Sequence, residues 1–533
     1  MRQGSATGMI ARRVLLKGSD RVAPEGATLV GDVEPDERIT VTVLVKRRTA
    51  DKFTPGSAGD LARLLKPVTR QALAAQRRRT HARAAARIHK LAAAYGLTVG
   101  RIDLVQRTVE IEGTVRQMAE IFGATLRIYD DGRRRFRARV GQLVIPAEIA
   151  PWTRAVLGFD ERPMVPTYRL QAQAGGGTGS GLWPTEMAAL YGIPLDRDVS
   201  SASVGIVALG GGYLAADLKA ALAAMKREAP VVVDVPVAGK SNTFGDGTTA
   251  AEQEIALDLQ VMAALLPKAR IAVYFADNSR DSLVAAIRQA VLDDVNRPQV
   301  ISVSWGSAEK FWNETGYEAM QAALADAIRL RVSMVFASGD ELATGGLTDG
   351  KVHVWFPASS PYVLGCGGTS PILGAGNTSI ASEAVWNEGF SGTGGGISDV
   401  FPVPAYQEKL ALPKSLNDGN VRRGVPDVAG AAASTPGYRI VVNGTEVIMD
   451  GTSAATPLWA ALIAMVNAAR GEPVGFLNSA LYSNPDAFRL IDRGNNRIGG
   501  KGYDAGPGWN ACTGLGVPKG EDIIAALTTT PMA

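Results

Sequence analysis

The chain has 533 residues, of which 46% are hydrophobic and 20% are charged. This composition is ordinary for a globular protein and excludes wholesale disorder and a fibrous repeat. Two cysteines and three histidines exclude a disulfide scaffold and a cysteine-based zinc cluster, and they leave few candidates for histidine-based chemistry. The net charge of +4 conceals a division, because residues 1–180 are strongly basic and the remainder is acidic. We expect the two parts to attract each other.

A basic nucleic-acid-binding arm is the alternative explanation of this charge. No recognition module accompanies the arginines, so we expect no nucleic-acid partner. The runs Arg77–Arg79 and Arg133–Arg135 are interpreted as solvent-exposed faces. The longest apolar stretch, 457–469, is too short to span a membrane and is interpreted as a buried helix. No standard signal peptide is visible in the first 30 residues.

The sequence predicts a compact α+β unit at 30–165, after an N-terminal tail at 1–29. Alternating β-branched and polar residues predict strands, an alanine- and arginine-rich stretch predicts a long helix, and an Asp-Gly pair predicts a hairpin turn. We expect two helices on a small antiparallel sheet. The expected strands are 38–45, 107–111, 125–129 and 135–140, and the expected helices are 68–95 and 114–122.

A glycine-rich segment at 166–181 is expected to be a flexible linker and a preferred place for proteolytic cutting. From 182 to 533, short apolar runs alternate with helical stretches. Runs that are apolar on both faces and separated by helices indicate a parallel sheet covered on both sides. We therefore expect one large α/β domain, with strands near 204–209, 270–275, 300–304 and 332–337.

The string Gly451–Pro457, with the sequence GTSAATP, is the most specific signal in the chain. It leads into an apolar helix and places Ser453 at the helix start, where backbone N–H groups and the helix dipole can stabilise an oxyanion. A Gly-Thr-Ser alone would be an ordinary helix cap. The seven-residue string resembles the nucleophile motif of the subtilisin-like superfamily.

A serine nucleophile needs a base. The acidic part of the chain has one histidine, His353, whose strand-like context indicates a structural role. Glu254 and Asp258 are the other candidates, because a spacing of four on a predicted helix at 250–266 puts both carboxylates on one face. One can accept the serine proton while the other orients it. A solvated acidic patch is the simpler explanation of this spacing taken alone.

Asp340 follows the predicted strand at 332–337. The carboxyl ends of parallel strands are where such folds place active sites. An aspartate kept protonated there can donate a hydrogen bond to a developing oxyanion. Taken alone, Asp340 would be read as a turn aspartate.

Together these segments resemble the sedolisin family, the serine-carboxyl peptidases, and within it the kumamolisin-like members. The resemblance covers nearly the whole chain, and its motifs stand in the family's order. It implies a subtilisin-like parallel sheet with flanking helices, preceded by an α+β ferredoxin-like propeptide. The matching segments are 156–160, 254–258, 300–306, 338–340, 423–428, 451–457 and 505–509.

The resemblance also implies the role of each active-site residue. Ser453 is the nucleophile, Glu254 its general base, and Asp258 the residue that orients Glu254. Asp340 and the backbone N–H of Ser453 form the oxyanion hole. No cofactor is required for the chemistry. The resemblance assigns substrate binding to Ser304, Trp305 and Gly306. The glycine run that includes Gly394 and Gly395 is expected to let a substrate backbone approach closely.

The resemblance implies that the N-terminal unit blocks the cleft of the acidic domain as an intramolecular inhibitor. Acid would protonate carboxylates of the enzyme domain and weaken the attraction to the arginines. We expect self-cleavage within 163–182. The family also implies an extracellular location and protein or peptide substrates, and we expect a monomer.

The chain departs from the family's calcium site. That site uses an aspartate, an isoleucine carbonyl, two glycine carbonyls and a second aspartate. Both aspartates are replaced, and Ca²⁺ prefers six to eight oxygen ligands that include carboxylates. We therefore expect calcium binding to be lost unless Asp492 turns inward. The corresponding positions hold Leu490, Ile491, Gly506, Gly508 and Asn510.

A second departure is Ala208, where kumamolisin-like enzymes have a glutamate that extends the proton network toward the tryptophan here numbered Trp305. The network should be shorter, although the core residues are present. The leading hypothesis is an acid-acting serine-carboxyl endopeptidase made as a self-processing zymogen. A tripeptidyl-peptidase of the same family is the first alternative, and a non-catalytic binding protein on this fold is the second.

Overall fold

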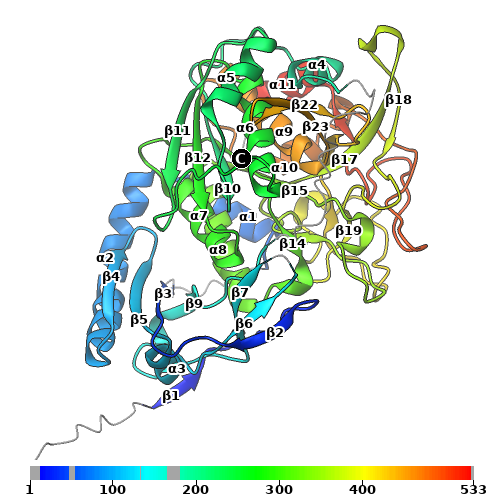
Figure 1. Cartoon of the computed structure of the whole chain (residues 1–533). Helices are drawn as coiled ribbons and strands as arrows, with labels where there is room; N and C mark the ends of the chain where they lie inside the picture. Colours follow the sequence, from blue (N-terminus) through cyan, green and yellow to red (C-terminus); the bar gives the residue numbers. More distant parts are fainter. Residues whose placement is uncertain (1–11, 47–53, 133, 165–180, 530–533) are drawn as a thin grey trace, which may run out of the picture.

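The N-terminal unit is built on a four-stranded antiparallel sheet in the order β4-β5-β3-β9. The computed structural model describes residues 12–46, 54–132, 134–164 and 181–529 (Figure 1). The strand and helix order of this unit, β-α-β-β-α-β, is that of a ferredoxin-like fold, as predicted. Its elements are β3 (Arg38–Val45), α2 (Arg70–Ala94), β4 (Thr98–Asp103), β5 (Thr108–Thr114), α3 (Val115–Phe122) and β9 (Thr153–Leu157).

Local sequence explains these elements. The β-branched residues of β3 alternate between exposed and buried positions along its first half, so one face of the strand packs on the core. Helix α3 begins at a capping box, in which the Thr114 hydroxyl and the Gln117 side chain satisfy backbone N–H groups. It ends at Gly123, whose φ of +60° favours glycine.

Two further small sheets complete the N-terminal unit. The predicted hairpin is present, and its second strand is β7 (Arg135–Val140). The segment 12–29, which the sequence sets apart as a tail, contributes a strand that pairs with β8 and the start of a strand that pairs with β6. The strands of these sheets are β1 (Arg13–Leu15), β2 (Thr28–Asp32), β6 (Thr125–Asp130), β7 and β8 (Val144–Pro146).

The remainder of the chain forms one large α/β unit around an eight-stranded sheet. The order is β11-β12-β10-β13-β15-β17-β18, with β21 paired to β17. All pairings are parallel except that of the edge strand β18. The strands are β10 (Ser203–Leu209), β11 (Val231–Pro236), β12 (Arg270–Ala276), β13 (Val300–Val303), β15 (Ser333–Ala337), β17 (Leu364–Leu373), β18 (Ile380–Val385) and β21 (Val428–Ala431).

Helices cover both faces of this sheet (Figure 1). Helices α4, α5, α6 and α9 pack together on one face, and α7 and α8 pack on the other, where α8 also contacts β9 of the N-terminal unit. The bounds are α1 (Ala58–Leu64), α4 (Pro184–Leu190), α5 (Ala215–Ala224), α6 (Ala250–Leu265), α7 (Arg280–Leu292), α8 (Glu314–Arg329), α9 (Thr452–Arg470), α10 (Asn478–Tyr482) and α11 (Gly520–Thr529).

The helix predicted at 457–469 is part of the longer α9. Within the described residues, α9 is the one helix whose length and hydropathy would allow it to cross a membrane, and 89% of its most apolar window is buried inside the protein. Its apolar residues are therefore accounted for by the core of the large unit.

The structure corrects the interpretation of one arginine run. Arg77 is buried and forms an ion pair of 2.5 Å with Asp326 of α8, so it joins the two units rather than facing solvent. Arg78 and Arg79 are exposed as predicted. In the second run, 133–135, residue 133 lies outside the described residues. Arg134 donates to the carbonyl oxygens of Glu161 and Asn278.

Two other expectations concern isolated side chains. His353 is buried, and its Nε2 lies 3.0 Å from Asp349 Oδ1, which fits the structural role expected of it. Cys366 and Cys512 are both buried and unpaired. The predicted linker, 166–181, lies outside the described residues apart from Gly181.

Candidate active site

Ser453 lies in the first turn of α9, directly after a tight turn at Gly451. The φ of Gly451 is +108°, and a Cβ at this position would lie 2.7 Å from Asp340 Oδ2. Both facts require glycine there. The turn therefore brings the nucleophile candidate and the Asp340 carboxyl group together, although they come from different elements.

Asp340 follows β15 and is held by the residue that precedes the serine. Its Oδ1 accepts hydrogen bonds from the Thr452 backbone N–H at 2.8 Å and from the Thr452 hydroxyl at 2.6 Å. Burial raises the pKa of Asp340, and the two Thr452 hydrogen bonds oppose that rise. A carboxyl group in this position stays protonated at a higher pH than an exposed aspartate.

Glu254 and Asp258 lie one turn apart on α6, and both are buried. Burial and the charge of Asp258 raise the pKa of Glu254, and the nearby Ser453 side chain opposes that rise. Burial raises the pKa of Asp258 to about 8, against a hydrogen bond from Ser304. The structure thus brings the serine and both carboxyl groups together, and the pair lies inside the protein, unlike a solvated acidic patch.

The hydroxyl of Ser304 contacts the catalytic candidates themselves. It donates to Asp258 Oδ1 at 2.7 Å, and it lies 3.5 Å from the backbone oxygen of Ser453. Sequence reasoning placed Ser304 among the substrate-binding residues only. Its neighbour Trp305 donates its indole N–H to the Val207 carbonyl of β10 at 2.9 Å, and Gly306 is buried against Trp355.

Ala208 is completely buried beside that carbonyl. The indole N–H of Trp305 is therefore satisfied by the backbone of β10 in a chain that has no glutamate at this position. This contact fixes the tryptophan without a carboxyl group.

Gly394 and Gly395 lie against the protein's own backbone. A Cβ at Gly394 would lie 2.2 Å from the Ser338 carbonyl oxygen, and one at Gly395 would lie 2.3 Å from that of Ala511. Close packing of the loop explains both glycines. Their substrate-binding role, and that of Gly306, stays a prediction.

Two carboxyl groups near Asp340 were missed by sequence reasoning. Burial and Asp340 raise the pKa of Glu341 to about 8. Burial, Asp340 and Glu388 raise the pKa of Asp450 to about 7. Their positions in the sequence could have identified them, because Glu341 directly follows Asp340 and Asp450 directly precedes the serine motif at 451–457. They make the surroundings of the nucleophile rich in groups that hold protons in acid.

The residues that correspond to the family's calcium site lie in one loop. Asp492 and Gly508 are exposed, whereas Ile491 and Asn510 are buried. Gly506 is half-buried, and Leu490 is 39% exposed. Asp492 does not turn inward. No group of three or more His, Cys, Asp or Glu side chains within the described ranges is arranged to hold a metal ion.

Comparisons with known proteins agree with this geometry. A family model described as "Pro-kumamolisin, activation domain" matches residues 25–162, and one described as "Subtilase family" matches residues 237–480. Kumamolisin of Bacillus sp. strain MN-32 is 40% identical over 97% of this chain and 96% of its own length. The chain belongs to the sedolisin family.

Two other sedolisins extend the comparison. Tripeptidyl-peptidase sed5 of Aspergillus fumigatus is 28% identical over 96% of this chain and 97% of its own. The structure of Pseudomonas sedolisin, solved in complex with pseudo-iodotyrostatin, matches with a TM-score of 0.58 and 28% identity over 66% of this chain and all of that one. This sedolisin is therefore a serine-carboxyl peptidase that carries an N-terminal propeptide.

Proposed function

We propose that this chain is an acid-acting endopeptidase whose nucleophile is Ser453 and whose general base is Glu254. The observation that carries the proposal is that the Ser304 hydroxyl contacts both Asp258 Oδ1, at 2.7 Å, and the backbone oxygen of Ser453, at 3.5 Å, which places the buried Glu254–Asp258 pair beside the nucleophile. Ser453 would attack the peptide carbonyl, form an acyl-enzyme and return a proton to the leaving amine through Glu254. Water would then hydrolyse the ester by the reverse proton transfers.

A shared proton accounts for the buried carboxyl pair. Glu254 Oε1 and Asp258 Oδ2 are buried and have no hydrogen-bond partner among the described residues. A proton on Asp258 Oδ2 that is directed at Glu254 Oε1 would satisfy both atoms. Two close carboxyl groups lose their protons in separate steps, and burial raises the pKa of both Glu254 and Asp258. The proposed mechanism requires that the first of these protons leaves Glu254, which would then accept the serine proton while Asp258 keeps its own.

Asp340, in its protonated form, would act as a hydrogen-bond donor in the oxyanion hole. Its raised pKa favours the protonated form, which can donate a hydrogen bond to the tetrahedral oxyanion beside the Ser453 N–H. Raising the pH removes that proton and with it the donor. The activity should therefore fall on the alkaline side, and proteolysis faster at pH 7 than at pH 4 would contradict the proposal.

Endopeptidase activity is preferred to tripeptidyl-peptidase activity because the chain is more similar to kumamolisin than to tripeptidyl-peptidase sed5. The products of a long peptide distinguish the two: internal fragments support an endopeptidase, and successive N-terminal tripeptides support the alternative. An extracellular location is proposed on the family resemblance.

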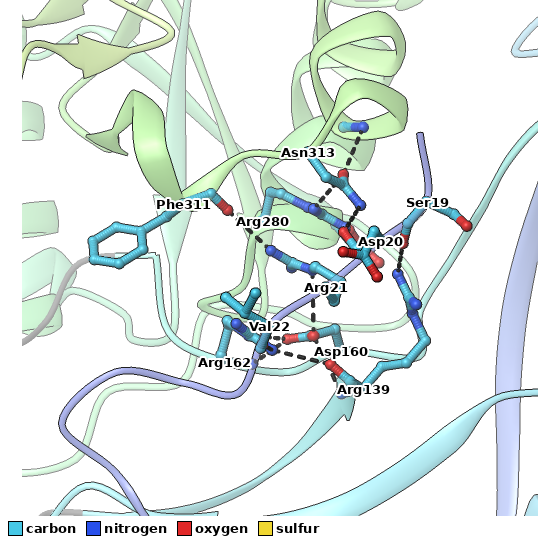
Figure 2. A network of polar contacts seen from close by, with 12 residues as sticks. Ser19, Asp20, Arg21, Val22, Arg139, Asp160, Arg162, Arg280, Phe311 and Asn313 are labelled. Carbon is cyan, nitrogen blue, oxygen red and sulfur yellow. Dashed lines mark hydrogen bonds and ion pairs between the residues drawn. The ribbon is translucent and has the colours of Figure 1, made fainter. Parts of the chain in front are cut away.

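The propeptide would act as an intramolecular inhibitor through a buried polar interface. Figure 2 shows its centre, where Arg21 of the propeptide reaches the Phe311 carbonyl at 3.0 Å and Asn313 donates to the Asp20 carbonyl at 3.0 Å. The Gly158 N–H donates to Asp281 at 2.7 Å. The contacts at Phe311 and Asn313 hold the segment that follows Ser304–Gly306 in the chain, and the contact at Asp281 holds the start of α7.

Asp160 would make this interface sensitive to acid. It is buried among Arg21, Arg162 and, from the peptidase unit, Arg280 (Figure 2). Burial by itself would raise the pKa of Asp160, but the three guanidinium groups lower it. A lowered pKa means that the stabilisation is complete above the unfolded value and is lost as the pH falls through the folded one. Asp160 would thus lose its charge, and release this interface, only at a pH below that at which an exposed aspartate takes up its proton.

The intact mass of purified protein after a shift from pH 7 to pH 4, beside a Ser453→Ala variant, tests the proposal. The expected result is that only the parent splits, within 163–182. Cleavage in the variant, or a mature N-terminus elsewhere, would refute serine-dependent self-processing. Failure of both to split, with no peptide hydrolysis in acid, would favour the non-catalytic binding protein.

A further inference from the structure

One buried asparagine holds together the loop that corresponds to the family's calcium site. The Oδ1 atom of Asn510 accepts hydrogen bonds from the Cys512 N–H at 3.1 Å, the Thr513 N–H at 3.0 Å and the Thr513 hydroxyl at 3.1 Å. Its Nδ2 donates to the Ile491 carbonyl at 3.0 Å. The side chain is 6% exposed, so these contacts are shielded from water.

The orientation of this amide follows from its neighbours. Backbone N–H groups can only donate, so those of Cys512 and Thr513 require the amide oxygen on their side. The NH₂ group must then face the Ile491 carbonyl. An aspartate at this position would place a carboxylate oxygen against that carbonyl oxygen, and a cation between them would be needed to remove the repulsion.

This chain therefore does not fit Ca²⁺ at the site. A lone pair of the Ile491 oxygen is directed at an N–H donor rather than at a cation. Asp492 faces solvent, and Leu490 supplies no side-chain oxygen. The remaining donors would be carbonyl oxygens with no carboxylate, a weak set for Ca²⁺.

The loop also contacts two segments near the active site. Asn496, which is completely buried, donates from Nδ2 to the Gly395 carbonyl at 3.2 Å, and its own carbonyl accepts from the Ala343 N–H at 3.0 Å. Ala343 follows Asp340 by three residues. Whatever orders this loop also helps to fix the chain at Gly395 and at Ala343.

We propose that the Asn510 amide replaces a calcium ion as the cross-link of the loop 490–514, so that this sedolisin keeps the loop ordered without a divalent cation. The link is an uncharged hydrogen-bond bridge between Ile491 and the turn at 512–513. The inference concerns folding and does not depend on the proposed peptidase mechanism.

Thermal unfolding of the full chain in the Ser453→Ala background tests the proposal, since this background excludes self-digestion. The midpoint Tm is measured at pH 7 in excess EDTA and in CaCl₂ for three proteins: the background itself, Asn510→Asp, and Leu490→Asp/Asn510→Asp. The matched control is Asn484→Asp. Asn484 also donates from Nδ2 to a backbone carbonyl, that of Ala480 at 2.8 Å, but it lies outside the loop.

The background protein should have the same Tm in EDTA and in CaCl₂. Asn510→Asp should lower the Tm in EDTA by roughly 2–8 °C, because a buried carbonyl loses its donor and meets a negative charge. The double variant should regain Tm in CaCl₂ and bind Ca²⁺ in a calorimetric titration, whereas Asn484→Asp should not respond to calcium. A background Tm that falls in EDTA and returns with CaCl₂ would overturn the proposal, as would an Asn510→Asp protein in EDTA as stable as the background.

Discussion

Replacing Thr452 by valine tests whether Asp340 controls the alkaline side of the pH profile. The Thr452 hydroxyl donates to Asp340 Oδ1 at 2.6 Å, while the backbone N–H bond at 2.8 Å does not depend on the side chain. Valine has nearly the shape of threonine but cannot donate. Because a hydrogen bond to a carboxylate stabilises its charged form, its loss should make Asp340 hold its proton to a higher pH.

The size of the effect follows from the strength of one such bond. A hydrogen bond to a charged group contributes about 1.5–3 kcal/mol, and one pH unit corresponds to about 1.4 kcal/mol. The alkaline limb of kcat should therefore move up by roughly one to two pH units. The assay is kcat against pH on a quenched peptide with the mature enzyme.

Thr452→Ser is the matched control, because serine keeps the hydroxyl group. The alkaline limb of its kcat profile should stay near that of the parent enzyme. The Thr452 hydroxyl oxygen also accepts from the Gly339 N–H at 3.3 Å, so Thr452→Val should lose some stability as well. That loss would not by itself move the limb. An alkaline limb that stays in place in Thr452→Val, or moves down, would show that another group sets it.

Three further predictions address other contacts. Ser304→Ala should lower kcat about tenfold and leave KM nearly unchanged, since Ser304 donates to Asp258; a raised KM at constant kcat would indicate substrate binding instead. Arg77→Gln should weaken the inhibitory propeptide and raise the pH at which processing begins, since Arg77 forms a buried ion pair with Asp326; an unchanged processing midpoint by intact mass would contradict this. Arg423→Met should cost about 3–5 kcal/mol of unfolding free energy, because it leaves a completely buried aspartate without its cation, as denaturant unfolding of an inactive variant would measure.

Local pattern was sufficient for the elements that alternate or repeat regularly. The strand at 38–45 was predicted with the bounds that β3 has, because its β-branched and polar residues alternate. The spacing of Glu254 and Asp258 correctly placed both on one face of a helix, since the helical period alone decides this. The parallel sheet followed from the apolar runs at 204–209 and 332–337.

Contacts between segments that are distant in the sequence could not be predicted from local pattern. Nothing in the run Arg77–Arg79 distinguishes the arginine that meets Asp326 from its two exposed neighbours, because the docking partner is about 250 residues away. The two hydrogen bonds from Thr452 to Asp340 depend on how α9 packs against β15. The sequence likewise showed that an aspartate was replaced by Asn510, but not that the amide would bridge to Ile491.

The position of α9 in the chain has a consequence for synthesis. This helix packs against the central strands β13, β15 and β17, so the large unit cannot close its core before the helix leaves the ribosome. The ferredoxin-like unit, by contrast, is complete by β9 (Thr153–Leu157). Domains generally fold as units, with the N-terminal one first. We therefore expect the propeptide to be folded before Ser453 emerges, so that no newly made chain is a working peptidase without its inhibitor already beside it.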